Sequence, residues 1–100
     1  MLVTINKTSQ QTIIRLKGRF DYDARRDFDA AAQIGLSEPA GEIQMNLMEV
    51  EYMDSSALGM LLVLRDKATA QGKTVSLSEC QGFVKKILDV ANFQKLFQTA

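Results

Sequence analysis

The chain has 100 residues, 46% of them hydrophobic and 24% charged, which suits one small globular domain with a single core. Its 12 basic residues balance 12 acidic ones, and this zero net charge argues against a nucleic-acid-binding protein, which usually has a clear basic excess. The sequence contains no histidine, so the usual general base and metal ligand are missing. We therefore predict no enzymatic activity, no cofactor and no metal site.

The cysteine content and the apolar runs bear on location. Cys80 is the single cysteine, so no intramolecular disulfide can form, as is typical of proteins in a reducing compartment. Residues 1–6 lack the basic region and the long apolar core of a signal peptide. The longest apolar run, residues 57–64, is too short to span a bilayer. We expect a cytoplasmic protein that does not insert into a membrane.

The N-terminal part predicts an antiparallel β-hairpin. Residues 2–5 and 12–17 are rich in strand formers, and the turn-like residues 9–11 separate them. In the second run Thr12, Ile14 and Leu16 alternate with other side chains, so they should form one face toward the core. Gly18 is expected to break this strand.

A helix over about residues 24–34 should follow, with Asp21 or Asp23 as its cap. A loop over residues 37–41 contains the single proline. Residues 42–47 then alternate polar and apolar, with Ile43, Met45 and Leu47 on one face. This alternation predicts the central strand of the sheet.

The next helix is predicted from residue 54 to about residue 70. Aspartate and serine cap helix N-termini because their oxygens accept from unpaired backbone N–H groups, and Asp54, Ser55 and Ser56 stand at this start. Gly72 suits the left-handed position after the helix. An apolar stripe should face the core, and it consists of Ala57, Met60, Leu61, Leu64 and Ala68.

This stripe leaves Gly59 and Val63 on the outside of the first two turns. Two interpretations remain open for them. Neighbouring elements cover this part of the helix, or Gly59 and Val63 form an exposed apolar patch that is available to a partner.

The C-terminal part predicts a strand over residues 73–77, parallel to residues 43–47 because a right-handed crossover joins them. A helix over residues 82–91 follows, and residues 93–97 are a candidate for a last strand. The predicted class is α/β, one domain over residues 1–100, in the order β-β-α-β-α-β-α with an optional closing strand.

The segment Met53-Asp54-Ser55-Ser56-Ala57-Leu58-Gly59 resembles the phosphorylation loop of bacterial anti-sigma factor antagonists, the small STAS-domain proteins. The family loop reads Asp-Ser-(Ser/Thr)-Gly-Leu-Gly, and Ala57 stands at the place of its first glycine. Two further segments match family patterns, Gly18-Arg19-Phe20-Asp21 and Met45-Asn46-Leu47. The resemblance covers nearly the whole chain and implies a mixed sheet with helices on one side. The family usually continues with one more helix, so the resemblance leads us to expect some sheet or helix surface to be less covered here.

The resemblance also implies site residues. Ser55 matches the serine that the family phosphorylates, and Ser56 is a less favoured candidate that we assign mainly to helix capping. Asp54 and Asp21 would lie close to the phosphate, although Asp21 can equally be a helix cap, and the two roles are compatible. The partner-binding surface would consist of Ser56, Gly59, Met60 and Val63.

In function, the resemblance implies a partner-switching regulator. The sequence leaves the oligomeric state open, and a monomer is our default expectation. Without phosphate it would bind an anti-sigma factor or serine kinase, and phosphorylation of Ser55 would release that partner. A serine phosphatase of the metal-dependent class would reset the switch. The alternative is a structural STAS subunit of an ABC-type membrane transport complex, although such subunits often lose the Asp-Ser-Ser loop. An enzyme with Ser55 or Ser56 as nucleophile is disfavoured, since histidine and a G-x-S-x-G motif are both missing.

Overall fold

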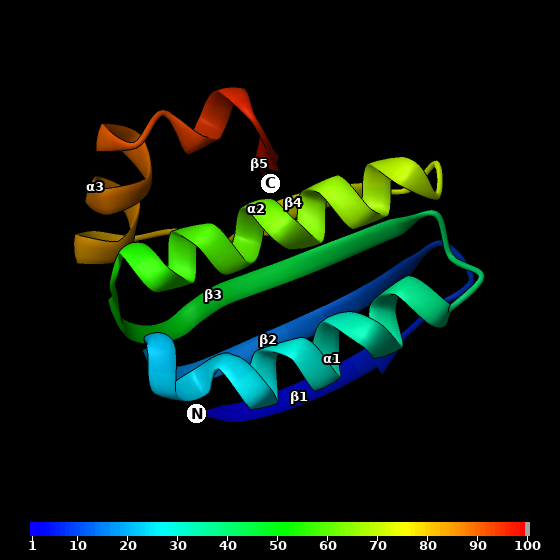
Figure 1. Cartoon of the computed structure of the whole chain (residues 1–100), viewed down its shortest axis with the longest axis horizontal. Coiled ribbons are helices and arrows are strands. Elements are labelled where there is room, and N and C mark those ends of the chain that lie inside the picture. The colour runs from blue at the N-terminus through cyan, green and yellow to red at the C-terminus, as the bar shows by residue number, and fades with distance from the viewer. Residues whose placement is uncertain (100) are drawn as a thin grey trace.

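The computed structural model describes residues 1–99, which form one mixed five-stranded sheet with helices packed on it (Figure 1). The strands lie in the sheet in sequence order, and β1 pairs antiparallel with β2 whereas every other neighbouring pair is parallel. Their bounds are Leu2–Lys7 for β1, Gln11–Phe20 for β2, Glu42–Met53 for β3, Thr74–Ser78 for β4 and Gln98–Thr99 for β5. The predicted hairpin and the central position of β3 are confirmed.

Three α-helices and two short 3₁₀ turns connect the strands. They are η1 (Tyr22–Ala24), α1 (Arg25–Ser37), α2 (Ser55–Ala70), α3 (Gly82–Val90) and η2 (Phe93–Lys95). Figure 1 shows α1 and α2 side by side in front of the sheet, with α3 beyond the end of β3. The α/β class and the predicted order of elements are confirmed. Within residues 1–99, no helix has both the length and the apolar character needed to cross a bilayer.

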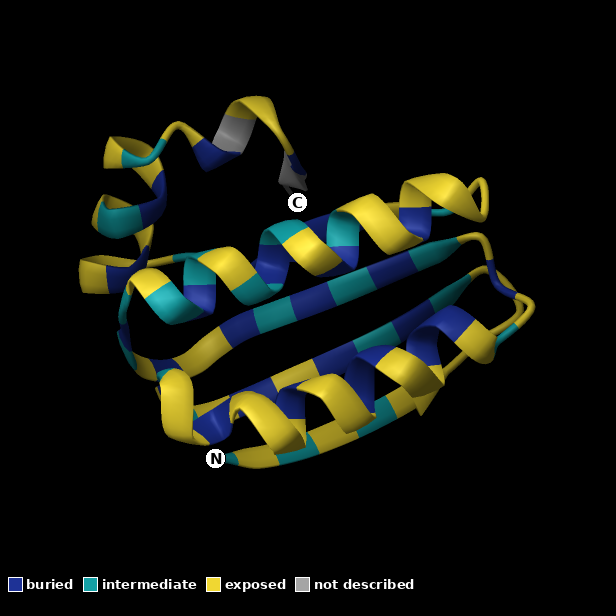
Figure 2. Ribbon diagram, in the orientation of Figure 1, coloured by how far each residue is buried: buried dark blue, intermediate teal, exposed yellow. Residues whose placement is uncertain are grey.

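The core lies between the sheet and the helices. Thr12, Ile14 and Leu16 of β2 are buried, and so are the apolar residues of β3 that alternate with polar ones (Figure 2). The Phe28 ring of α1 stacks on the Phe20 ring of β2 with centroids 5.0 Å apart, which ties the first helix to the sheet. The stripe predicted on α2 is buried at Ala57, Leu61, Leu64 and Ala68 and half-buried at Met60.

Several predicted boundaries are wrong. Gly18 does not break β2 but lies inside it with φ +100°, a conformation that glycine adopts without a Cβ clash. The central strand continues beyond Leu47 to Met53, and α1 extends to Ser37. The closing strand is β5, because residues 93–95 form a 3₁₀ turn instead of a strand.

Candidate functional site

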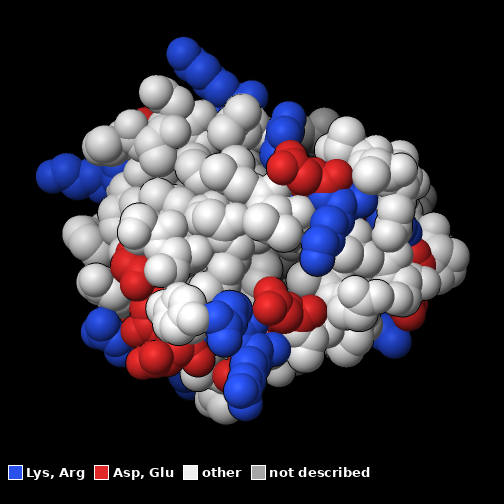
Figure 3. Space-filling model, viewed as in Figure 1, with Lys and Arg blue, Asp and Glu red and all other residues white. Residues whose placement is uncertain are grey.

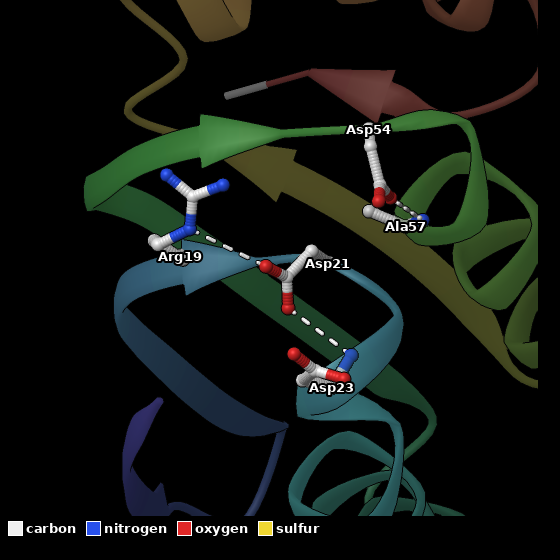
Figure 4. A network of polar contacts seen from close by, with 5 residues as sticks. All are labelled: Arg19, Asp21, Asp23, Asp54 and Ala57. Carbon is white, nitrogen blue, oxygen red and sulfur yellow. Dashed lines mark hydrogen bonds and ion pairs between the residues drawn. The ribbon is translucent and has the colours of Figure 1, made fainter.

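The carboxyl ends of β2 and β3 bring the two predicted phosphosite aspartates together. Phe20 and Met53 are register partners in the parallel ladder, and Asp21 and Asp54 are the next residue of each strand. Both aspartates then lead into a helical element, η1 after Asp21 and α2 after Asp54. Figure 4 shows Asp21 and Asp54 at this end of the sheet.

Asp54 caps α2. Its backbone is extended, and its Oδ1 accepts a hydrogen bond from the Ala57 N–H at 3.0 Å (Figure 4). This bond satisfies one of the N–H groups that the first helical turn leaves without an intrahelical partner. The capping role assigned mainly to Ser56 is therefore wrong: Ser56 is the second residue of the helix, and Asp54 is the cap.

Asp21 has the same local geometry. Its Oδ1 accepts from the Asp23 N–H at 3.1 Å, so Asp21 caps η1. The predicted cap of the following helix by Asp21 or Asp23 is wrong, because α1 begins after Ala24, which makes no side-chain capping bond. The Asp21 Oδ2 accepts from the Arg19 Nε at 3.3 Å (Figure 4). The carboxylate is thus bound on both oxygens, which fixes its orientation at the end of β2.

The two serines differ in environment. Ser55 is the first residue of α2, and its side chain is exposed. Ser56 is half-buried and belongs to the wall of a groove between α1 and α2. A protein that approaches from solvent can therefore reach Ser55 more easily than Ser56.

The groove between α1 and α2 has a volume of about 580 Å³. It contains all four predicted partner-binding residues, Ser56, Gly59, Met60 and Val63. Figure 3 shows this side of the molecule, where uncharged side chains cover the middle and charged ones of both signs border it. Val63 is 52% exposed, and an added Cβ on Gly59 would meet nothing within 4 Å. The interpretation of Gly59 and Val63 as an exposed patch is the one that fits these positions.

Sequence reasoning missed the opposite wall of the groove, which α1 provides. Tyr22, Arg25, Asp29 and Gln33 line it, over an apolar floor that includes Phe28 and Leu36. The signal was the spacing of Arg25, Asp29 and Gln33, which recur every fourth residue and so share one side of a helix. The sequence alone does not tell which neighbour such a side faces.

A second group that sequence reasoning missed joins β2, β3 and α3 beside the aspartates. The Arg19 guanidinium carbon lies 4.2 Å from the centroid of the Tyr52 ring, and Tyr52 stacks with Phe83 at 6.3 Å between centroids. Arg19 and Tyr52 are register partners, so the ladder itself creates the first of these contacts. The group anchors α3 to the end of β3.

Cys80 lies between β4 and α3 and is half-buried. Burial raises the pKa of its thiol above the ordinary value of 9.0, while the charge of Lys85 lowers the pKa and those of Asp89 and Glu79 raise it. A thiol with a raised pKa is a poor nucleophile at neutral pH. Within residues 1–99, no cluster of three or more His, Cys, Asp or Glu side chains could hold a metal ion.

Comparisons with known proteins agree with this fold. The chain is similar to SpoIIAA of Bacillus, an anti-sigma factor antagonist, in its unphosphorylated form (21% identity, TM-score 0.76, covering 99% of this chain and 87% of that one). Its phosphorylated form gives 20% identity and a TM-score of 0.67, covering 99% and 91%. A sulfate transporter family protein from Wolinella succinogenes also shares the fold (14% identity, TM-score 0.72, covering 84% and 68%).

The closer likeness is in sequence. The chain is 42% identical over 90 residues to a STAS-domain containing protein of Pseudomonas aeruginosa, which covers 89% of this chain and 87% of that protein. The family model described as "Mlab, STAS domain" matches residues 3–98. These matches confirm the family that the Asp-Ser-Ser loop predicted: the chain belongs to the STAS-domain family.

Proposed function

We propose that this STAS domain is an anti-sigma factor antagonist that switches partners through phosphorylation of Ser55. The observation that carries the proposal is the position of Ser55, exposed on the first turn of α2 directly after the capping Asp54. The fold shared with SpoIIAA, which exists in unphosphorylated and phosphorylated forms, supports it.

The release step follows from electrostatics. A phosphoserine carries a charge of about −1.5 to −2 at neutral pH. On Ser55 it would stand next to Asp54, and a bound partner would have to remove water from both charges. Burial of a charge without a counter-charge costs several kcal/mol, and a loss of about 3–4 kcal/mol weakens binding by more than about a hundredfold. The domain need not refold.

In this proposal the chain is the substrate of the switch and not its catalyst. A serine kinase of the anti-sigma type supplies ATP and Mg²⁺ and modifies the Ser55 hydroxyl. A metal-dependent serine phosphatase removes the phosphate again. The unphosphorylated domain holds the anti-sigma factor through the α2 surface that contains Gly59 and Val63.

Paired affinity capture from native lysate tests the proposal. The baits are Ser55→Ala, which cannot be phosphorylated, and Ser55→Asp, which carries less charge than phosphate. Thr69→Ala and Thr69→Asp are matched controls at an exposed hydroxyl of the same helix outside the groove. We expect Ser55→Ala to retain a kinase-like protein that Ser55→Asp loses, whereas the Thr69 pair retains it equally. If phosphorylation of Ser55 leaves the affinity for that protein unchanged, the proposal is wrong.

A structural subunit of a membrane transport complex is the second candidate. The observation in its favour is the shared fold with a sulfate transporter family protein. In this case both Ser55 baits should capture the same transport proteins, and Asp54 would serve only as a helix cap.

A further inference from the structure

The groove between α1 and α2 has the dimensions of a helix-binding site. Both helices return between parallel strands, so they run in the same direction, as Figure 1 shows. The groove extends from Arg25 to Leu36 on α1 and from Ser56 to Lys67 on α2. The eleven helical steps between the ends of each wall correspond to about 16 Å, or about three turns.

Much of the lining of the groove is apolar, and these residues are Phe28, Ala32, Leu36, Met60, Val63 and Leu64. Such a surface matches the apolar side of an amphipathic helix, which presents residues at intervals of three and four. Val63 is 52% exposed, so part of this apolar surface faces solvent and a partner could cover it.

Gly59 is the residue of the α2 wall that has no side chain. Glycine inside a helix costs about 1 kcal/mol relative to alanine. Nothing within the described chain requires it, because a Cβ at this position would meet no atom within 4 Å. A missing side chain on the outer wall allows a partner backbone to come close, as small residues do at helix–helix contacts.

The charged residues at the two ends of the groove indicate which side chains the partner helix should carry at its ends. Arg25 lies at the Ser56 end and Lys67 at the opposite end, and both are exposed. Within residues 1–99 Lys67 makes no ion pair, and Arg25 contacts the ring and hydroxyl of Tyr22 instead of a carboxylate. Asp29 lies between them along the α1 wall. Cations at both ends favour acidic groups at both ends of the bound helix.

We infer that the groove binds one amphipathic helix of a protein partner, about three turns long, with an apolar ridge over Met60 and Val63 and acidic residues opposite Arg25 and Lys67. This inference rests on the proposed function and specifies how the partner is held. It also adds to the release step, because a phosphate on Ser55 would stand near the acidic end of the helix that faces Arg25.

Site-specific photo-crosslinking in cells tests the geometry. Benzoylphenylalanine replaces Gln33 on the α1 wall or Val63 on the α2 wall of the full chain, in a Ser55→Ala background that keeps it unphosphorylated. The control position is Thr4, which is exposed on β1. We expect Gln33 and Val63 to crosslink to one segment of about 12 residues in one protein, with helical apolar spacing and acidic flanks, and Thr4 not to.

Four other crosslinking products would overturn the inference. They are a lipid adduct, a second copy of this chain, different segments on the two walls, and a segment without acidic flanks.

A charge-reversal series covers the case in which the bulky probe itself blocks the groove. Lys67→Glu is compared with Lys86→Glu, since Lys86 is also exposed and lies on α3 outside the groove. The probe is the protein that Ser55→Ala retains. We expect Lys67→Glu to weaken its binding about tenfold at low salt and less at high salt, with little effect of Lys86→Glu. Equal effects would overturn the inference, yet the proposed Ser55 switch would stand if Ser55→Asp still lost the partner.

Discussion

Asp21 and Asp54 occupy equivalent positions on neighbouring parallel strands. Each follows one member of the Phe20–Met53 register pair, and each accepts a hydrogen bond from a backbone N–H of the helical element that it begins. Two like charges therefore lie at one end of the sheet, and a capping hydrogen bond stabilises each carboxylate. A phosphate on Ser55 would add a third negative charge at this end.

Two substitutions of Asp54 distinguish the contribution of its capping hydrogen bond to stability from that of its charge. Asp54→Ala should lower the free energy of unfolding by about 1 kcal/mol, because the Ala57 N–H loses its acceptor. Asp54→Asn should leave stability nearly unchanged, because asparagine caps as well as aspartate and lacks only the charge. Urea denaturation measures both. Equal losses in the two variants would show that the charge, and not the hydrogen bond, stabilises α2.

Gly59→Ala should stabilise the domain by up to about 1 kcal/mol. The residue lies inside α2, and the added methyl group finds open space. Gly18→Ala is the matched control, because its φ of +100° strains any side chain, and it should destabilise. Both are measured as shifts of the urea midpoint. If Gly59→Ala destabilises the isolated domain, an internal contact requires the glycine, and its explanation by partner approach fails.

Local patterns predicted the elements of this fold well where the period of the strand is regular. The alternation of Ile43, Met45 and Leu47 gave the central strand correctly, and the prediction stopped there because the alternation stops. The structure explains why: Arg15 pairs with Asn46 but Lys17 pairs with Glu49, so β3 carries an extra residue. A second extra residue lies between the partners of Gly18 and Arg19. Each extra residue shifts the alternation of buried and exposed side chains by one position, so the pattern no longer indicates that the strand continues.

The candidate site was only half predictable. Capping chemistry and the apolar stripe of α2 identified Asp54, Gly59 and Val63, because these signals lie within one element. The α1 wall of the groove depends on how α1 and α2 pack side by side, and packing between elements leaves no period in the sequence. The contact of Arg19 with Tyr52 likewise depends on the register of β2 against β3.

Two phenylalanines should differ widely in their contribution to stability. Phe28 is 2% exposed and stacks on Phe20, so Phe28→Ala should cost about 3–5 kcal/mol through lost burial and a cavity. Phe83 is 55% exposed and contacts Tyr52 at the surface, so Phe83→Ala should cost only about 1 kcal/mol. Urea denaturation of both variants checks the difference. Val84 and Leu88 already place the inner side of α3 in the core, so a similar cost for both variants would mean that the outward Phe83 ring contributes as much as a core side chain.

Cys80 should make stability depend on pH in the alkaline range. Burial raises the pKa of its thiol above 9.0 in the folded protein, so the folded state keeps this proton to a higher pH than the unfolded chain does. Its contribution is therefore fully present below about pH 9 and is lost as the pH rises through the folded pKa. Cys80→Ala, which cannot titrate, should lose less stability between pH 8 and about pH 10 than the unsubstituted chain.

Alkylation by iodoacetamide gives an independent measure, because the thiolate is the reacting form. In the folded protein the reaction should be slower at pH 8 than in urea, and its rate should rise at higher pH than for the unfolded chain. Equal pH profiles in the two states, together with identical stability curves for Cys80→Ala and the unsubstituted chain, would contradict a raised pKa. The thiol would then be more open to solvent than its half-buried position indicates.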